Sequence, residues 1–198
     1  MLLKRDIENG VGEGEFGSRR EKLDKRSRFK TTVIHPSDPT TDFLAPIYRK
    51  SSAIRQVKEK EEYRQKLLES DRSILLGHGF PQGLAGNGRI IIDESFGDIF
   101  REQPNNIYIF CNADCYLTLN GLRGFATGMF ISERIEAMIF NVEATAAQIK
   151  ESNELFAELV RKSFDRTATE VYTCVESEYR IRGNPVVEYN LPRIRVFE

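Results

Sequence analysis

The chain has 198 residues, a length that suits one domain of ordinary size or slightly more. Lys and Arg total 29 against 30 Asp and Glu, and this near balance argues against a dedicated nucleic-acid-binding protein. No apolar run approaches the roughly 18 residues that cross a bilayer, and the N-terminus lacks the apolar region of a secretory signal. Three cysteines exclude a complete disulfide framework, so a reducing, cytoplasmic compartment is expected.

Residues 1–30 differ from the rest of the chain in composition. They hold nine Lys or Arg and six Asp or Glu residues, and they show no sustained hydrophobic period. This composition is typical of a solvated N-terminal arm, and a tether for an acidic surface or nucleic acid is the alternative. Residues 31–198 are therefore expected to form a single folded domain.

From residue 31 onward, strand-like and helix-like segments alternate. In chain order we predict a strand at 31–34, a short helix capped by Thr40 or Thr41, a helix at 52–70, strands at 73–76 and 89–92, a brief helix at 93–101, a strand at 107–111, a helix at 122–129, a strand at 138–140, a helix at 143–164 and a strand at 171–175. Strands separated by helices indicate parallel strands with right-handed connections. Continuous apolar strands are expected when both faces of a sheet are covered. The predicted fold class is therefore α/β, a three-layer sandwich with a mainly parallel central sheet.

Polar, compact loops follow three of the predicted strands. Loops after the carboxyl ends of parallel strands open on one edge of the sheet, where ligands bind in open α/β folds. The strands at 31–34, 73–76 and 107–111 are expected to gather their loop side chains in one cleft. The candidate site residues are His35, Asp38, Thr40, Thr41, His78, Gly79, Asn112, Asp114 and Cys115.

Both histidines of the chain lie in these loops. His78 stands between Gly77 and Gly79, which permit unusual backbone angles and a close approach of a ligand. An imidazole titrates near neutral pH, so His78 is suited to act as a general base. A hydrogen-bonded turn residue is the alternative role for either histidine.

Two of these motifs resemble the caspase-like cysteine peptidases, in particular bacterial domains of the CHAT type. The matching segments are LLGHG at 75–79 and IYIFCNADCY at 107–116. In that family a strand ending in His-Gly supplies the base, and a following strand ends in Ala-Cys, the nucleophile. The resemblance covers residues 73–164 and implies a caspase-like or flavodoxin-like sandwich that cleaves a peptide or protein substrate without a cofactor. It makes His78 the base and Cys115 the nucleophile, with backbone N–H groups near Gly79 as oxyanion donors.

The match departs from the family at the nucleophile position. If Asn112 and Ala113 take the place of the residues before the nucleophile, Asp114 falls on that position and Cys115 lies one residue late. A shift of one residue at the end of a strand points the side chain in a substantially different direction, although a bulge in the loop would restore that direction. Cys111 is the alternative thiol, but it lies within the apolar run and is expected to be inert core.

Other functions are open on the same residues. A non-catalytic binding or regulatory module would hold a small polar or phosphorylated ligand at the strand ends. Its anionic group would be bound by Ser37, Thr40, Thr41 and the N–H groups at the start of the following helix. A small-molecule hydrolase would use Asp114 with His78, and two carboxylates with two histidines could bind a divalent metal. The sequence contains no phosphate-loop or dinucleotide motif, and no metal is assigned. A partner protein, a filament or a second copy would supply any regulation.

Overall fold

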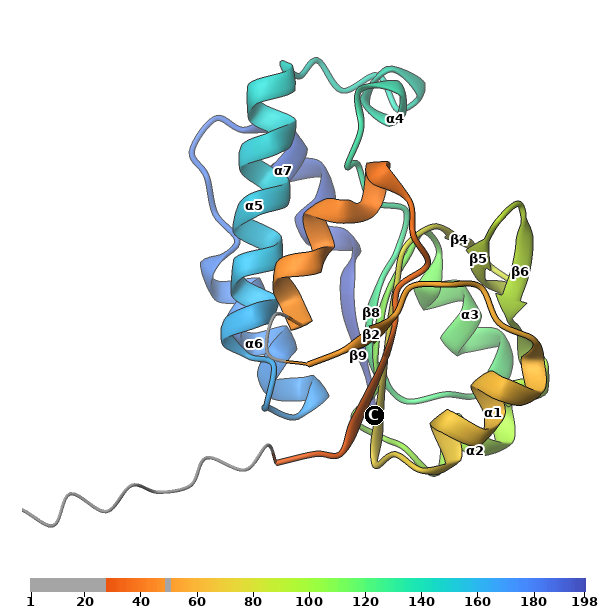
Figure 1. The fold of residues 1–198 in the computed structure, drawn as a ribbon. Coiled ribbons are helices and arrows are strands. Elements are labelled where there is room, and N and C mark those ends of the chain that lie inside the picture. The colour runs from red at the N-terminus through yellow and green to blue at the C-terminus, as the bar shows by residue number, and fades with distance from the viewer. Residues whose placement is uncertain (1–27, 49–50) are drawn as a thin grey trace, which may run out of the picture.

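The computed structural model describes residues 28–48 and 51–198. Figure 1 shows a central sheet with helices packed on both of its faces, the three-layer α/β arrangement predicted from the sequence. The predicted N-terminal arm lies outside the described residues up to position 27. At its described end, Arg28 forms an ion pair with Glu170, with 3.2 Å between Nη1 and Oε2. No helix in the described ranges is long and apolar enough to span a membrane.

The main sheet has six strands in the spatial order β2-β1-β3-β7-β8-β9. The first five of these run parallel, and β9 pairs antiparallel with β8 at one edge. Both faces of the sheet are covered, which explains why its central strands are continuous apolar runs rather than alternating ones. The strands are β1 (Thr31–Ile34), β2 (Ala53–Ile54), β3 (Arg72–Leu76), β7 (Ile107–Ile109), β8 (Gly124–Thr127) and β9 (Ile194–Phe197).

A small three-stranded antiparallel sheet follows β3 and consists of β4 (Gly79–Phe80), β5 (Gly83–Gly86) and β6 (Arg89–Ile92). The turn between β5 and β6 places Asn87 and Gly88 at positive φ, as a tight hairpin turn requires. The strand predicted at 89–92 is therefore confirmed, but it belongs to this small sheet and not to the main one.

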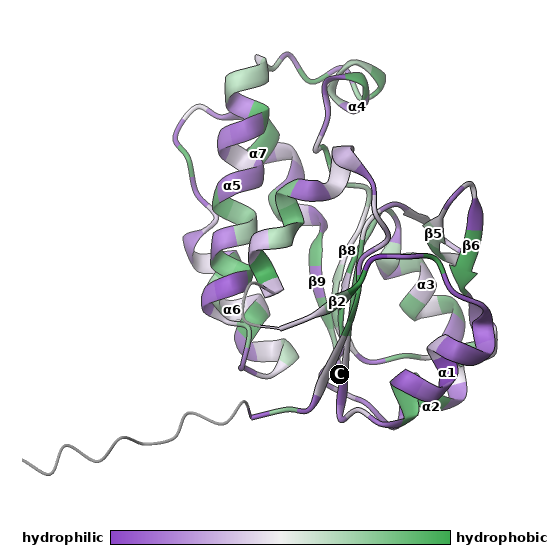
Figure 2. Cartoon of the chain, in the orientation of Figure 1, coloured by the Kyte–Doolittle hydropathy of each residue, from purple (hydrophilic) through white to green (hydrophobic). Residues whose placement is uncertain are grey.

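Two hydrophobic cores lie on opposite faces of the main sheet. Successive residues of β3 alternate between them, with Ile74 and Leu76 in one core and Leu75 in the other. In Figure 2 the helices carry both apolar and polar residues, as expected for elements with one buried and one exposed side. One face is covered by η1 (Pro39–Tyr48), α5 (Ala146–Lys162), α6 (Ala168–Glu178) and α7 (Pro185–Asn190), and the other by α1 (Lys60–Leu68), α2 (Gly97–Arg101) and α3 (Ala113–Asn120). The remaining described helices are α4 (Arg134–Ile139), η2 (Glu94–Phe96) and η3 (Leu191–Arg193).

The helix predicted at 122–129 is wrong, because Gly124–Thr127 form the buried strand β8. Helix α3 ends before this segment, where Gly121 adopts a left-handed conformation with a φ of 60°. Gly124 then has a φ of 138°, and a Cβ at this position would lie 2.5 Å from the carbonyl oxygen of Asn106. Apolar residues at i, i+3 and i+4 occur here because the strand is buried on both faces, a pattern that spacing alone does not distinguish from a helix.

Two predicted strands in the C-terminal half are also wrong, because both segments are helical. Residues 138–140 lie at the end of α4, and residues 171–175 lie within α6. Each helix begins with a capping box, in which the N-cap residue and the third helical residue satisfy each other's backbone N–H groups. The β-branched residues that suggested a strand, Val171 and Val175, lie four positions apart and form the buried face of α6.

The long helix predicted at 52–70 is shorter than expected. Residues 53 and 54 form β2, which pairs in parallel with β1, and only the second half of the segment is the helix α1. Glu59 is the N-cap of α1 and forms a capping box with Glu62. The chain between β2 and α1 therefore runs along the strand-end side of the sheet instead of within a helix.

Candidate functional site

The carboxyl ends of β1 and β3 bring both histidines to the same edge of the main sheet. Ile34, the last residue of β1, pairs with Leu75 of β3, and His35 and His78 follow these two strands. Strand β7 runs parallel beside β3, so the loop that begins at Phe110 opens on this edge as well. The three strand ends that we expected to converge do lie on one edge (Figure 1).

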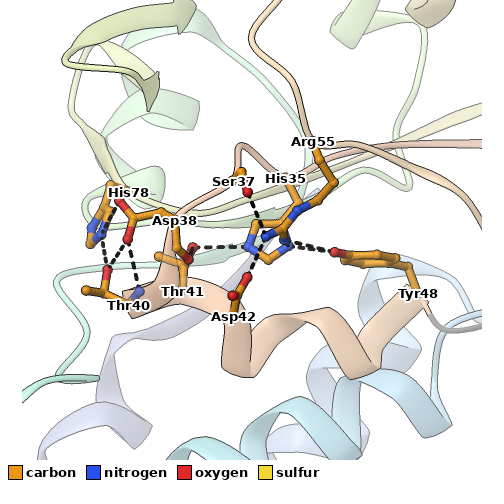
Figure 3. A network of polar contacts seen from close by, with 9 residues as sticks. All are labelled: His35, Ser37, Asp38, Thr40, Thr41, Asp42, Tyr48, Arg55 and His78. Carbon is orange, nitrogen blue, oxygen red and sulfur yellow. Dashed lines mark hydrogen bonds and ion pairs between the residues drawn. The ribbon is translucent and has the colours of Figure 1, made fainter.

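His78 is held by a chain of hydrogen bonds from the loop after β1 (Figure 3). Its Nε2 lies 2.7 Å from the hydroxyl of Thr40, which in turn donates to Oδ1 of Asp38 at 2.7 Å. Because a threonine hydroxyl has one hydrogen, the imidazole carries its proton on Nε2 and donates it to Thr40. Oδ2 of Asp38 lies 3.7 Å from the same nitrogen. Nδ1 of His78 is therefore the nitrogen that can accept a proton.

Asp38 also organises the start of η1. Its carboxylate accepts from the amide of Thr40 at 2.9 Å, and its backbone carbonyl accepts from the amide and the hydroxyl of Thr41 at 3.1 and 3.2 Å. Hydrogen bonds from Thr40 lower the pKa of Asp38, so this carboxylate is ionised at neutral pH. The sequence suggested Thr40 or Thr41 as the cap of this helix, but the cap is Asp38. The amide and hydroxyl of Thr40, which were expected to bind an anion, are bonded to the carboxylate of Asp38 instead, and those of Thr41 are bonded to its backbone carbonyl.

His35 is fully buried within a second group of polar side chains (Figure 3). Its Nδ1 lies 2.7 Å from Nη1 of Arg55 and 2.9 Å from the hydroxyl of Tyr48, and its Nε2 lies 3.1 Å from Oγ1 of Thr41. A guanidinium can only donate, so Nδ1 accepts and the N–H at Nε2 donates to Thr41. Arg55 also pairs with Asp42 at 2.5 Å.

These surroundings keep the ring of His35 neutral. Burial, together with the positive charge of Arg55, lowers the pKa of His35 to about 4. Both ring nitrogens are hydrogen-bonded inside the fold. His35 therefore holds the loop after β1, the helix η1 and the residue after β2 together, and it offers no free nitrogen to a ligand.

A small cavity lies between the end of β3 and the end of β7. Its volume is about 20 Å³, which is enough for about one water-sized group. His78 and Cys111 both line it, together with residues from η1 and from the segment after β8. Cys111, and not the predicted nucleophile Cys115, is therefore the thiol that shares a cavity with His78.

The thiol of Cys111 is protonated at neutral pH. Burial raises its pKa to about 11, and the carboxylate of Glu136 adds to this shift, with 4.0 Å between Sγ and Oε1. Glu136 is itself buried, and its other oxygen accepts from the amides of Ser132 and Glu133 at 2.7 and 2.9 Å. A carboxylate beside a thiol opposes ionisation, so Cys111 is not a preformed thiolate.

The other residues predicted after β7 lie at the start of α3. Asn112 is the N-cap in a left-handed conformation with a φ of 62°, and Asp114 Oδ2 lies 3.4 Å from Nε of Arg195. Cys115 is exposed, and desolvation and the carboxylate of Asp114 raise its pKa. Within the described part of the chain, no hydrogen bond or ion pair joins these three residues to His78, and none joins Cys111 to it, because the Cys111 thiol donates to Glu136.

Gly79 allows the loop of His78 to approach the end of β7. A Cβ at this position would lie 2.2 Å from the ring of Phe110, so a larger residue would force the two strand ends apart. This close packing is a structural reason for glycine here. The role of nearby backbone N–H groups as oxyanion donors stays a prediction.

The group around His35 is completed by Asp42, Tyr48 and Arg55, which are not predicted from the sequence. Arg55 lies within a predicted helix, whereas in the structure it directly follows β2. Recognising Ala53–Ile54 as a strand would have placed Arg55 at the same sheet edge as His35. Asp42 and Tyr48 lie on η1, and no sequence signal distinguishes them from surface residues.

Comparison with known proteins identifies no relative of this chain. Within residues 28–48 and 51–198, no group of three or more His, Cys, Asp or Glu side chains is placed to hold a metal ion. No known protein family, no curated protein and no solved structure matches the chain. The fold is α/β with a mainly parallel mixed sheet.

Proposed function

We propose that the protein hydrolyses an amide bond in a peptide or protein substrate, with Cys111 as the nucleophile and His78 as the base. The observation that carries this proposal is that both side chains line one cavity, at the ends of neighbouring parallel strands. Asp38 and Thr40 would supply the third part of such a site, a group that orients the base. The resemblance to caspase-like peptidases supports the same chemistry, with the thiol moved from Cys115 to Cys111.

In the proposed reaction, Nδ1 of His78 removes the thiol proton while the sulfur attacks the scissile carbonyl carbon. The tetrahedral oxyanion collapses to a thioester on Cys111, and the imidazolium gives its proton to the departing amine. Water, deprotonated by His78, then hydrolyses the thioester and releases a carboxylic acid and the free thiol. The carboxylate of Asp38, acting through Thr40, would stabilise the imidazolium in both steps. Backbone N–H groups near Gly79 are the donors proposed for the oxyanion.

The thiol of Cys111 has to lose its proton during the attack and not before it. A pKa of about 11 leaves very little thiolate at neutral pH. General-base catalysis accommodates this, because the proton leaves as the new bond forms. The same pKa predicts slow alkylation of Cys111 by iodoacetamide at pH 7, with a rate that rises toward pH 11.

Cleavage of a peptide mixture tests the proposal. The full chain is incubated with peptides derived from a whole proteome, and new termini are counted by mass spectrometry. Cys111→Ala and His78→Gln should each lower cleavage by at least about 100-fold, the usual contribution of a nucleophile or general base. Thr40→Val should retain cleavage at a rate about 10-fold lower, because the base is present but no longer oriented.

Cys115→Ala is the matched control, since it removes an exposed thiol near the same strand end. It should leave the cleavage rate within about twofold of the unmodified chain. Cleavage that survives Cys111→Ala, or the absence of any cleaved peptide, would rule out the proposed reaction.

A non-catalytic binding module is the second candidate, because both thiols near the strand ends have raised pKa values. In such a module the cleft beside His78 and Thr40 would hold a small polar ligand. The carboxylate of Asp38 would repel a phosphate, so a neutral ligand such as a sugar is the expected class. Cys111→Ala would then leave ligand affinity nearly unchanged, whereas His78→Ala would weaken it, and the unmodified chain would show no turnover.

A further inference from the structure

A large groove lies beside the cavity that His78 and Cys111 share. Its volume is about 860 Å³, which is within the range of ligand sites in proteins. Residues of η1 and α5 form its two walls, and Figure 1 shows these two elements lying against each other. Phe43 and Ser132 line both the groove and the small cavity, and Thr40, the hydrogen-bond partner of His78, lines the groove too. The groove therefore adjoins the cavity that the proposed catalytic side chains line.

One polar side chain of this groove has an atom without a partner. Asn153 on α5 is only 7% exposed, and its Nδ2 donates to the backbone carbonyl of Ser132 at 2.9 Å. A carbonyl only accepts, so this bond fixes which end of the amide is the oxygen. Oδ1 of Asn153 is buried, and no donor within the described residues reaches it. A buried acceptor without a hydrogen bond is unfavourable, so a ligand whose binding uncovers Oδ1 and brings an N–H group to it gains a favourable hydrogen bond.

The walls of the groove are uncharged overall. Glu154 pairs with Lys150 at 3.7 Å and Glu158 pairs with Arg161 at 2.5 Å, so these charges are matched within α5. The charged residues that line the groove are three acidic and three basic, namely Glu133, Glu154, Glu158, Arg134, Lys150 and Arg161. Apolar side chains lie among them, namely Phe43, Pro46, Ile149 and Leu155. Such walls favour a ligand that is apolar and carries no net charge.

We propose that this groove binds an extended, uncharged segment of a peptide substrate, with an apolar side chain beside Phe43 and a backbone N–H donated to Oδ1 of Asn153. An extended peptide offers an N–H group at every residue and projects side chains between them, which suits one buried acceptor among apolar walls. The inference rests on the proposed function, because it makes the groove the specificity site for a bond cleaved at Cys111.

Binding to the Cys111→Ala chain tests the inference without cleavage. The probes are acetylated, amidated hexapeptides of alanine and serine with one central leucine, and matched peptides with lysine or glutamate in its place. The leucine peptide should bind at least about 10-fold more tightly than either charged peptide. A second series replaces one backbone N–H at a time by an ester oxygen, and one position should lose about 10-fold in affinity because it no longer donates to Asn153.

Asn153→Leu in the same chain removes the acceptor. It should lower the affinity for the leucine peptide by about 10-fold. It should also abolish the difference in affinity between that peptide and the ester analogue that binds more weakly. Gln65→Leu is the matched control, because it replaces an exposed amide on α1, away from the groove, and should change nothing. The ester series decides the question on its own if Asn153→Leu does not fold.

Equal binding of charged and neutral peptides, insensitivity to every ester, or no binding at millimolar peptide would overturn the groove assignment. Selective, Asn153-dependent binding with no cleavage by the unmodified chain would support the groove and overturn the proposed hydrolysis. Cleavage that depends on Cys111 but is unaffected by Asn153→Leu would support the proposed hydrolysis and overturn the groove assignment.

Discussion

The buried ring of His35 links the stability of the fold to pH. Its pKa falls from the ordinary 6.5 to about 4 in the folded protein, because the ring leaves water and faces Arg55. Between these values the unfolded chain takes up a proton that the folded chain does not, so stability is lost as the pH falls from about 6.5 to 4. The expected loss is about 3 kcal/mol, at about 1.4 kcal/mol per unit of pKa difference. Urea unfolding at pH 7, 5.5 and 4 measures it.

Two substitutions separate His35 from the other groups that titrate in this range. His35→Gln should flatten the free energy of unfolding between pH 6.5 and 4, although it also lowers stability at pH 7 by disturbing Arg55 and Thr41. His78→Gln removes the only other imidazole of the chain and should keep most of the slope. The explanation fails if the slope survives in His35→Gln and disappears in His78→Gln.

The residues of the site differ in how far the sequence predicts them. His35, Asp38, Thr40 and His78 follow predicted strands, and parallel pairing is sufficient to bring them to one edge. The choice of thiol is different, because it depends on the direction of the chain after β7. There Asn112 turns the backbone with a φ of 62°, which leaves Cys111 in the cavity. No residue pattern reveals such a turn in advance.

Among the secondary-structure elements, two glycines mark the junction of α3 and β8, since Gly121 caps the end of α3 and Gly124 begins β8. Gly124 has a φ of 138°, and a Cβ would lie 2.5 Å from the carbonyl oxygen of Asn106, which accepts from the amide of Phe125. Gly124→Ala should therefore lower the free energy of unfolding by about 3 kcal/mol. Gly121 also has positive φ, but a Cβ there would meet nothing within 4 Å. Gly121→Ala should cost only about 1 kcal/mol, and equal losses in urea unfolding would refute the close-contact explanation.

Elements with strong local signals are predicted correctly, and those defined by tertiary contacts are not. The amphipathic helix α5 and the apolar strands β1 and β3 need only their own sequence to be recognised. Strand β2 has two residues and exists because β1 pairs with it, so its own composition carries no signal. Helix α6 contains β-branched residues typical of strands, and its capping box decides its conformation instead.

At the level of the whole molecule, the alternation of strands and helices is sufficient to predict a parallel sheet covered on both faces. It does not predict the antiparallel edge strand β9, because four α-helices and the 3-10 helix η3 separate it from β8 in sequence and none of them enforces its direction. The order of the strands depends on the edge of the sheet to which each crossover connection adds the next strand. That choice depends on the packing of complete helices against the sheet and not on local sequence.

Because one sheet separates the two hydrophobic cores, both helical layers should unfold in a single transition. Ile107 lies in the core beneath α5, and Ile34 lies in the core beneath α3. Ile107→Val and Ile34→Val should each lower the free energy of unfolding by about 1 kcal/mol, and the double variant by about the sum. Amide hydrogen exchange in α5 and α3 measures the two layers separately. Each substitution should raise exchange equally in both helices, since neither layer keeps its core when the shared strands separate. Faster exchange confined to the substituted face would mean that the layers unfold independently.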